Sequence, residues 1–190
     1  MSYEVNNLAG PYTGVARVYV WFSYDDYQLD VASNFSTFHG ATGSGVFIGG
    51  NDVLTASHVV YDAINNRVPY RIEVVPGLDT NYPASGAAEV PFGTFRADKV
   101  AYFDNFDPNH DGYILPGDAT AGSLGGSELD VAILDLSIIN SAPTPAPMRM
   151  DTTFNSGSLR LTGYPASANG NPMEEIVSAN RYGSDNSFLV

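Results

Sequence analysis

No cysteine occurs among the 190 residues of the chain, which excludes disulfides, thiolate metal sites and a cysteine nucleophile. Basic residues are also scarce, because 8 Lys and Arg stand against 21 Asp and Glu, giving a net charge of −13 with His neutral. Nucleic-acid binding needs a basic footprint for the phosphates, so the composition argues against a nucleic-acid partner. The same acidic balance argues against docking on anionic membranes.

Long apolar runs are missing as well. No run of roughly eighteen apolar residues occurs, so we expect no membrane-spanning helix. The segment 1–12 carries Glu4 and no basic residue, and it lacks the charged and apolar regions of a secretory signal. If the protein acts outside the cell, we expect a secretion route without such a signal, or a signal that has been removed.

Glycine, proline and aromatic residues are plentiful, with 19 Gly, 12 Pro, 12 Tyr and 10 Phe. This mixture favours many short strands and turns over long helices. We therefore predict a mainly β protein, with a polar loop or irregular hairpin at 23–40 and one helical turn at 57–63. The predicted strands are 14–22, 43–50, 53–56, 70–75, 99–103, 130–136, 158–162 and 174–177.

A proline-rich stretch divides the chain. The run Ser141–Pro147 holds three prolines, cannot sit in a central strand and indicates a linker. We therefore expect a first β unit over 1–139, a linker over 140–147 and a second β unit over 148–190.

Three short motifs carry the functional signal. Residues 43–60 combine a glycine-flanked strand, a turn and the sequence Leu-Thr-Ala-Ser-His, which ends at His58. Asp130 begins the run Asp-Val-Ala-Ile-Leu, and Gly-Tyr-Pro follows at 163–165. In this order the motifs resemble those of trypsin-like serine peptidases, and in particular the cysteine-poor, glutamyl-endopeptidase-like branch. The resemblance covers roughly residues 12–190.

The resemblance implies a fold and a chemistry. The fold would be two antiparallel β-barrels of the chymotrypsin type, with the second barrel incomplete in this chain. His58 would be the general base that takes the proton of a serine hydroxyl, and Asp130 the carboxylate that orients its ring. The implied activity is that of a serine endopeptidase, acting on polypeptide substrates.

The nucleophile motif of that family, G-[DN]-S-G-[GS]-P, does not occur after Gly-Tyr-Pro. Ser156 lies in Asn-Ser-Gly-Ser, but it precedes the Gly-Tyr-Pro motif, and no Gly follows Ser187. The resemblance therefore implies that the serine would lie beyond Val190, in a portion that could be a separate chain, a cleaved piece or a deleted part. It also implies that the 190 residues alone do not hydrolyse peptides. Residues 188–190 would begin the strand before the nucleophile loop.

An acidic loop between the two motifs resembles a calcium-binding loop. Within the insertion 104–118, Asp, Asn and Asp occupy alternate positions and Gly112 follows them, as in the EF-hand loop. Oxygen ligands at this spacing suit Ca²⁺, although an Asx-rich turn without metal gives the same pattern. We expect Ca²⁺ to hold the strand that presents Asp130, and its affinity range to suit an extracellular setting. The candidate ligands are Asp107, Asn109, Asp111, Asp118 and the backbone carbonyl of Tyr113.

Two other functions remain open. The chain could be a catalytically inactive, peptidase-like module that binds calcium or protein, or a structural β domain of a larger secreted protein. Paired His58 and Asp130 motifs favour the peptidase, whereas the missing serine motif favours an inactive module. The reading frame beyond Val190 would distinguish these alternatives.

Overall fold

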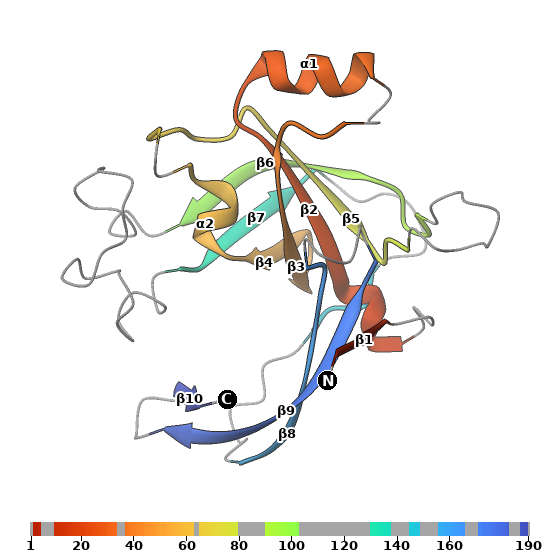
Figure 1. The fold of residues 1–190 in the computed structure, drawn as a ribbon, viewed down its shortest axis with the longest axis vertical. Helices are drawn as coiled ribbons and strands as arrows, with labels where there is room; N and C mark the ends of the chain where they lie inside the picture. Colours follow the sequence, from red (N-terminus) through yellow and green to blue (C-terminus); the bar gives the residue numbers. More distant parts are fainter. Residues whose placement is uncertain are drawn as a thin grey trace.

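The computed structural model describes residues 2–4, 10–33, 37–62, 65–79, 90–102, 130–137, 145–148, 156–165, 171–182 and 187–189. These residues form a closed β-barrel and a separate open sheet that extends away from it (Figure 1). The mainly β prediction is confirmed, as is the pairing of one complete barrel with a partial second β unit.

The barrel consists of antiparallel strands in the order β2-β3-β4-β7-β6-β5, and it closes where β5 pairs with β2. Closure leaves no free strand edge in this unit. The strands are β2 (Val15–Trp21), β3 (Ala41–Gly49), β4 (Asp52–Thr55), β5 (Arg71–Pro76), β6 (Phe95–Tyr102) and β7 (Ala132–Leu136). Each overlaps a strand predicted from the sequence.

The core of the barrel follows from the two-residue period of its strands. On β2, Ala16, Val18 and Val20 point inward and are fully buried, whereas Arg17 and Tyr19 point outward and remain partly exposed. The inward residues of the other strands complete one apolar cluster, which includes Phe47, Val53, Ile72, Val74, Ala132, Leu134 and Leu136.

The second sheet is built around one long strand. Strand β9 (Met173–Tyr182) pairs antiparallel with β1 (Ser2–Glu4), β8 (Ser156–Gly163) and β10 (Ser187–Leu189). Both chain ends therefore lie in this sheet (Figure 1). Residues 2–4 belong here by pairing, although the proposed division counts them with the first unit. That division, with its linker at 140–147, stays a prediction.

The described end of the proline-rich run lies against the barrel. The Met148 N–H donates to the Phe47 carbonyl at 2.6 Å, and the Ala146 N–H donates to the Thr13 hydroxyl at 3.2 Å. Thr13 belongs to a short 3-10 helix, η1 (Gly10–Gly14), that leads into β2. The chain is therefore attached to the barrel before it enters the second sheet.

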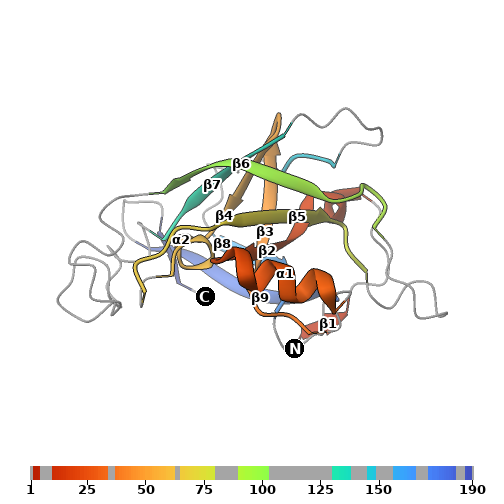
Figure 2. The same ribbon diagram turned by 90° about the horizontal axis from the view of Figure 1, so that it is seen from above.

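The prediction of a loop or hairpin at 23–40 is wrong for its first part, where the structure has helix α1 (Tyr24–Ala32). The helix lies outside the barrel at one end of β2 (Figures 1 and 2). Ser23 caps it, because its hydroxyl accepts from the Asp26 N–H at 3.0 Å and donates to the Asp26 carboxylate at 2.6 Å. Among the described residues, no helix is long and apolar enough to cross a membrane.

Candidate active site

His58 lies on α2 (Ser57–Val60), a single helical turn that follows β4 directly. The Ser57 hydroxyl donates to the Val131 carbonyl at 2.9 Å, which fastens this turn to the start of β7. On its other side the turn packs on Gly43 of β3, where a Cβ would lie 2.5 Å from a methyl carbon of Val59. A side chain at Gly43 would push α2 outward and displace His58.

Sheet pairing explains why two residues far apart in sequence meet. Strand β4 pairs with β7 so that Thr55 lies opposite Ala132. The end of β4, which leads to His58, is therefore beside the start of β7, which follows Asp130. The family motifs place a histidine and an aspartate just outside these paired ends, and the barrel brings them together.

His58 and Asp130 make two contacts. The His58 Nδ1 lies 2.7 Å from Asp130 Oδ2, and the His58 backbone N–H donates to Asp130 Oδ1 at 3.0 Å. A carboxylate beside Nδ1 favours the tautomer that carries its hydrogen on Nδ1. The lone pair is then on Nε2, and 63% of the His58 side chain is exposed, so that an incoming hydroxyl group can reach it. This is the geometry that a general base and its orienting carboxylate require.

The Gly-Tyr-Pro motif joins the second sheet to the barrel. The Tyr164 N–H donates to the Ser44 hydroxyl of β3 at 2.7 Å, and Gly163 approaches the same side chain closely. The Tyr164 side chain is buried in a small cluster with Val15, Val75 and Leu78. Its burial, and secondarily the charge of Asp79, raises the pKa of the Tyr164 hydroxyl. This motif therefore holds the two units together and supplies no group that contacts His58.

A cleft of about 420 Å³ lies at the same junction, between Ser44 and the strands β8 and β9. Glu174 lines it with its side chain almost fully buried, and the Tyr12 hydroxyl donates to this carboxylate at 2.6 Å. Neither His58 nor Asp130 lines the cleft. It is therefore separate from the candidate base.

The candidate calcium ligands Asp107, Asn109, Asp111, Tyr113 and Asp118 lie outside the described residues. Within the described ranges, no group of three or more His, Cys, Asp and Glu side chains is placed to hold a metal ion. The calcium site therefore stays a prediction from the sequence.

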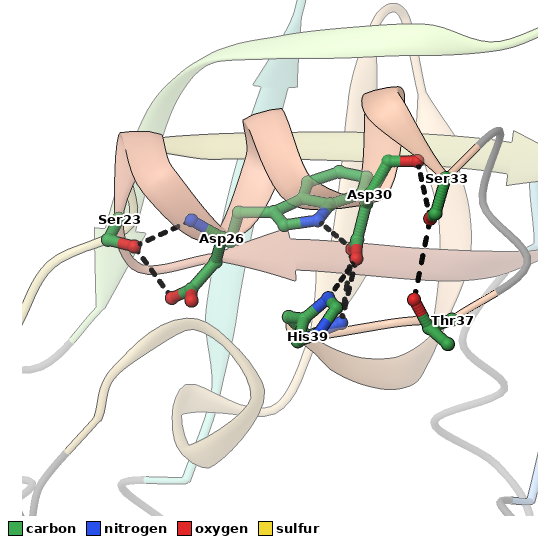
Figure 3. A network of polar contacts seen from close by, with 7 residues as sticks. Ser23, Asp26, Asp30, Ser33, Thr37 and His39 are labelled. Carbon is green, nitrogen blue, oxygen red and sulfur yellow. Dashed lines mark hydrogen bonds and ion pairs between the residues drawn. The ribbon is translucent and has the colours of Figure 1, made fainter.

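Sequence reasoning missed a second histidine–aspartate pair (Figure 3). The His39 ring nitrogen Nδ1 and the His39 backbone N–H both contact Asp30 on α1. The indole N–H of Trp21 donates to the same carboxylate at 2.7 Å, and Asp30 is fully buried. The one available signal was Ser23-x-x-Asp26, a capping pattern that predicts a helix start. With that helix in place, Asp30 falls on its last turn.

The comparisons with known proteins agree with this geometry. The sequence matches the trypsin-like peptidase domain family over residues 43–187, which is more than half of the chain. No curated protein matches it.

Several solved structures share the fold at low sequence identity. One is a Glu endopeptidase in complex with MPD, with a TM-score of 0.62 and 18% identity, matched over 96% of this chain and 70% of that chain. Another is the protease Anisep from Arthrobacter nicotinovorans, with a TM-score of 0.61 and 12% identity, matched over 98% of this chain and 71% of that chain. A third is HL collagenase, with a TM-score of 0.59 and 14% identity, matched over 97% of this chain and 67% of that chain.

These likenesses establish the barrel architecture, and the family match covers both the histidine and the aspartate motif. The chain therefore belongs to the trypsin-like peptidase domain family.

Proposed function

We propose that this chain supplies the base and the orienting carboxylate of a serine endopeptidase. The observation that carries the proposal is the pair of contacts between Asp130 and His58, one to the ring and one to the backbone N–H. Two contacts fix the position of the imidazole as well as its tautomer, which is what proton transfer to Nε2 requires.

The reaction follows from that arrangement. A serine Oγ bonds to the scissile carbonyl carbon while its proton passes to Nε2 of His58, and the carbonyl π pair moves onto oxygen. The imidazolium that forms is stabilised by the Asp130 carboxylate. Nε2 then returns the proton to the leaving amine as the C–N bond breaks, and water releases the acyl group by the same steps. In this proposal the serine belongs to a polypeptide segment outside the printed sequence, which lacks the G-[DN]-S-G motif after Gly-Tyr-Pro.

A fluorophosphonate probe tests the proposal on the protein purified from its source. Intact-mass analysis should give a mass above that calculated for the 190 residues, with one probe molecule bound per chain. His58→Ala should abolish labelling, whereas His39→Ala, which alters the other histidine–aspartate pair, should leave it unchanged. Labelling that survives His58→Ala would contradict the proposed role of His58.

A second candidate function is a peptidase-like module without catalysis, which serves as a calcium-binding or structural β domain of a larger secreted protein. The missing G-[DN]-S-G motif favours it. For this candidate, the source protein would have the mass of the 190 residues or would lack the motif elsewhere, and no probe would bind.

We also propose that Ca²⁺ binds the loop that contains Asp107, Asn109 and Asp111 and thereby steadies the segment leading to Asp130. Alternate oxygen ligands followed by Gly112 support this proposal. Calcium at the concentrations found outside cells would keep such a site loaded.

A further inference from the structure

Arg17 is a cation without a counter-charge. Its Nε and Nη1 atoms are hidden from solvent and have no hydrogen-bond partner, and no described residue forms an ion pair with it. Its one specific contact is with the Tyr19 ring, whose centroid lies 5.2 Å from the guanidinium carbon. In contrast, Arg67, Arg71 and Lys99 each contact a carboxylate.

Hidden donors without an acceptor are uncommon and unfavourable. Buried polar side chains are nearly always hydrogen-bonded, and an unpaired charged donor costs more than a neutral one. A shortage of carboxylates does not explain it, since the chain has 21 Asp and Glu and only 8 Lys and Arg. An arginine without a hydrogen-bond acceptor in the protein is expected where a ligand supplies that acceptor.

Arg17 lines a cleft of about 530 Å³ on the outer face of β2 and β5. Tyr19, Trp21 and Phe38 form an aromatic wall, because Phe38 meets both of the other rings edge-on at centroid distances of 5.5 and 5.3 Å. Leu78 adds an apolar surface. The volume, and a mainly apolar lining with two charged groups, Arg17 and Glu73, are typical of ligand sites.

The other charged group in the cleft is engaged elsewhere. Glu73 accepts a hydrogen bond from Nε of Arg71 at 2.7 Å and forms an ion pair with Nη2 of the same side chain at 2.6 Å. Burial raises the pKa of the Tyr19 hydroxyl, the Arg17 charge lowers it and the Glu73 charge raises it. Because Glu73 is paired with Arg71, Arg17 is the charged group of the cleft that has no ion-pair partner among the described residues.

We propose that this cleft binds an acidic peptide segment, with a carboxylate on Arg17 and a neighbouring aromatic side chain against Tyr19 and Phe38. A guanidinium group and a carboxylate are complementary in charge, and Nη2 is not among the Arg17 nitrogens that are hidden from solvent. The aromatic wall favours a ring in offset or edge-on contact.

The peptide character of the ligand follows from the rest of the lining. Thr42 and Thr94 also line the cleft, and a threonine hydroxyl can both donate to and accept from peptide groups. His58 and Asp130 do not line the cleft, so this site is additional to the proposed catalytic pair.

The experiment uses Trp21, which is the one tryptophan of the chain and lines the cleft. The intact protein is titrated with the capped peptide Ac-Phe-Glu-Phe-NH2 and, as a control of the same shape, Ac-Phe-Gln-Phe-NH2, while Trp21 fluorescence is recorded. The Glu peptide should bind at least about tenfold more tightly, as expected for a hydrogen bond to a charged group. Arg17→Gln should remove that preference, and Glu73→Gln should strengthen binding because it removes a repulsive charge.

Arg96→Gln is the matched control, since Arg96 is exposed and does not line the cleft. It should leave both affinities unchanged. Urea unfolding checks that Arg17→Gln is folded, and Arg17→Lys, which keeps the charge but loses the fork, should give an intermediate preference.

Equal binding of the Glu and Gln peptides by the unaltered protein would overturn the proposal even if no Arg17 variant folds. So would a preference that survives Arg17→Gln, because the peptide would then be bound elsewhere, for example near His58. Phenylacetate binding as tightly as the Glu peptide would overturn the peptide assignment.

Discussion

His39 and His58 contact their aspartates in the same way, yet the two pairs occupy different surroundings. In each pair the backbone N–H and the ring Nδ1 of the histidine both face the carboxylate. Asp30 is fully buried and lies nine residues from His39, whereas the Asp130 side chain is 27% exposed and lies 72 residues from His58.

A further hydrogen-bond donor, found for Asp30 among the described residues, distinguishes the two pairs. Asp30 also accepts from the indole of Trp21, so its carboxylate joins α1, β2 and the segment before β3 (Figure 3). Asp130 joins only the paired ends of β4 and β7, through His58. The contact pattern alone therefore does not identify a catalytic base. Burial, the accessibility of Nε2 and the family motif separate the two pairs.

The largest expected effect concerns catalysis. In the active protease, Asp130→Asn should lower kcat by about 10⁴-fold, since an amide favours the wrong tautomer of His58. Asp30→Asn should leave kcat unchanged. The measurement is peptide hydrolysis by both variants, and equal losses would mean that the two pairs do not differ in function.

The next effect concerns stability, for which the Asp30–His39 pair should matter more than the Asp130–His58 pair. Asp30→Ala removes the carboxylate that accepts from the indole N–H of Trp21 and from the His39 N–H, and should lower the free energy of unfolding by about 3 kcal/mol. Asp130→Ala removes a partly exposed carboxylate and should cost about 1 kcal/mol. Urea unfolding followed by far-UV circular dichroism measures both values, and a larger loss for Asp130→Ala would contradict the assignment.

Calcium binding should stabilise the segment that leads to Asp130, and it should not depend on the Asp30–His39 pair. Saturation at about 100 times the Kd should stabilise the folded protein by about 2.7 kcal/mol and raise the Tm of metal-stripped protein. Asp111→Ala should abolish this shift, whereas Asp30→Asn should lower the Tm without changing the shift. An unmoved Tm in a calcium titration of stripped protein would refute the calcium proposal, and Mg²⁺ at the same concentration is the control.

The smallest effect is the pH dependence of stability at Asp30. Burial raises the pKa of this carboxyl, but hydrogen bonds from Trp21 and His39 and the charge of His39 outweigh it, so the net shift is downward. A pKa below the unfolded value of about 3.9 means that Asp30 adds stability above that pH. This contribution is lost as the pH falls through the folded-state pKa.

Asp30→Asn should therefore flatten the decline of the unfolding free energy below about pH 4. Part of the decline should remain, since the pKa of Asp62 is also lowered: burial raises it, but hydrogen bonds from Asn65 and Arg67 and the Arg67 charge prevail. Unfolding free energies measured from pH 2 to 7 test this, with Asp130→Asn as the matched variant. A curve for Asp30→Asn parallel to that of the unaltered protein would exclude the linkage.

The strands of the barrel could be predicted because apolar β-rich runs mark them, and alternation along β7 reports its inward face directly. The histidine–aspartate pair could be predicted from motif order. Helix α1 could not, because its one buried residue is Asp30, and a helix without an apolar stripe gives no helical periodicity. Its capping pattern at Ser23 was the signal that remained.

The Arg17 cleft was equally hidden from the sequence. Both faces of β2 are covered, since Val15 and Trp21 are buried on the outer side as Val18 is on the inner side. Alternation then no longer separates the core from the surface. A cation on the outer face has the pattern of an ordinary solvated residue, and only the structure shows that its donors are hidden.

The pairing of β1 with β9 sets an order of assembly during synthesis. Ser2 faces Glu175 in the sheet, so β1 is synthesised before the barrel strands and its partner β9 is synthesised after them. All strands of the barrel lie between them in sequence, from β2 to β7, and can close while β1 still has no partner. The second sheet is therefore expected to be the last part of the described fold to form, and β1 stays without its partner strand until then.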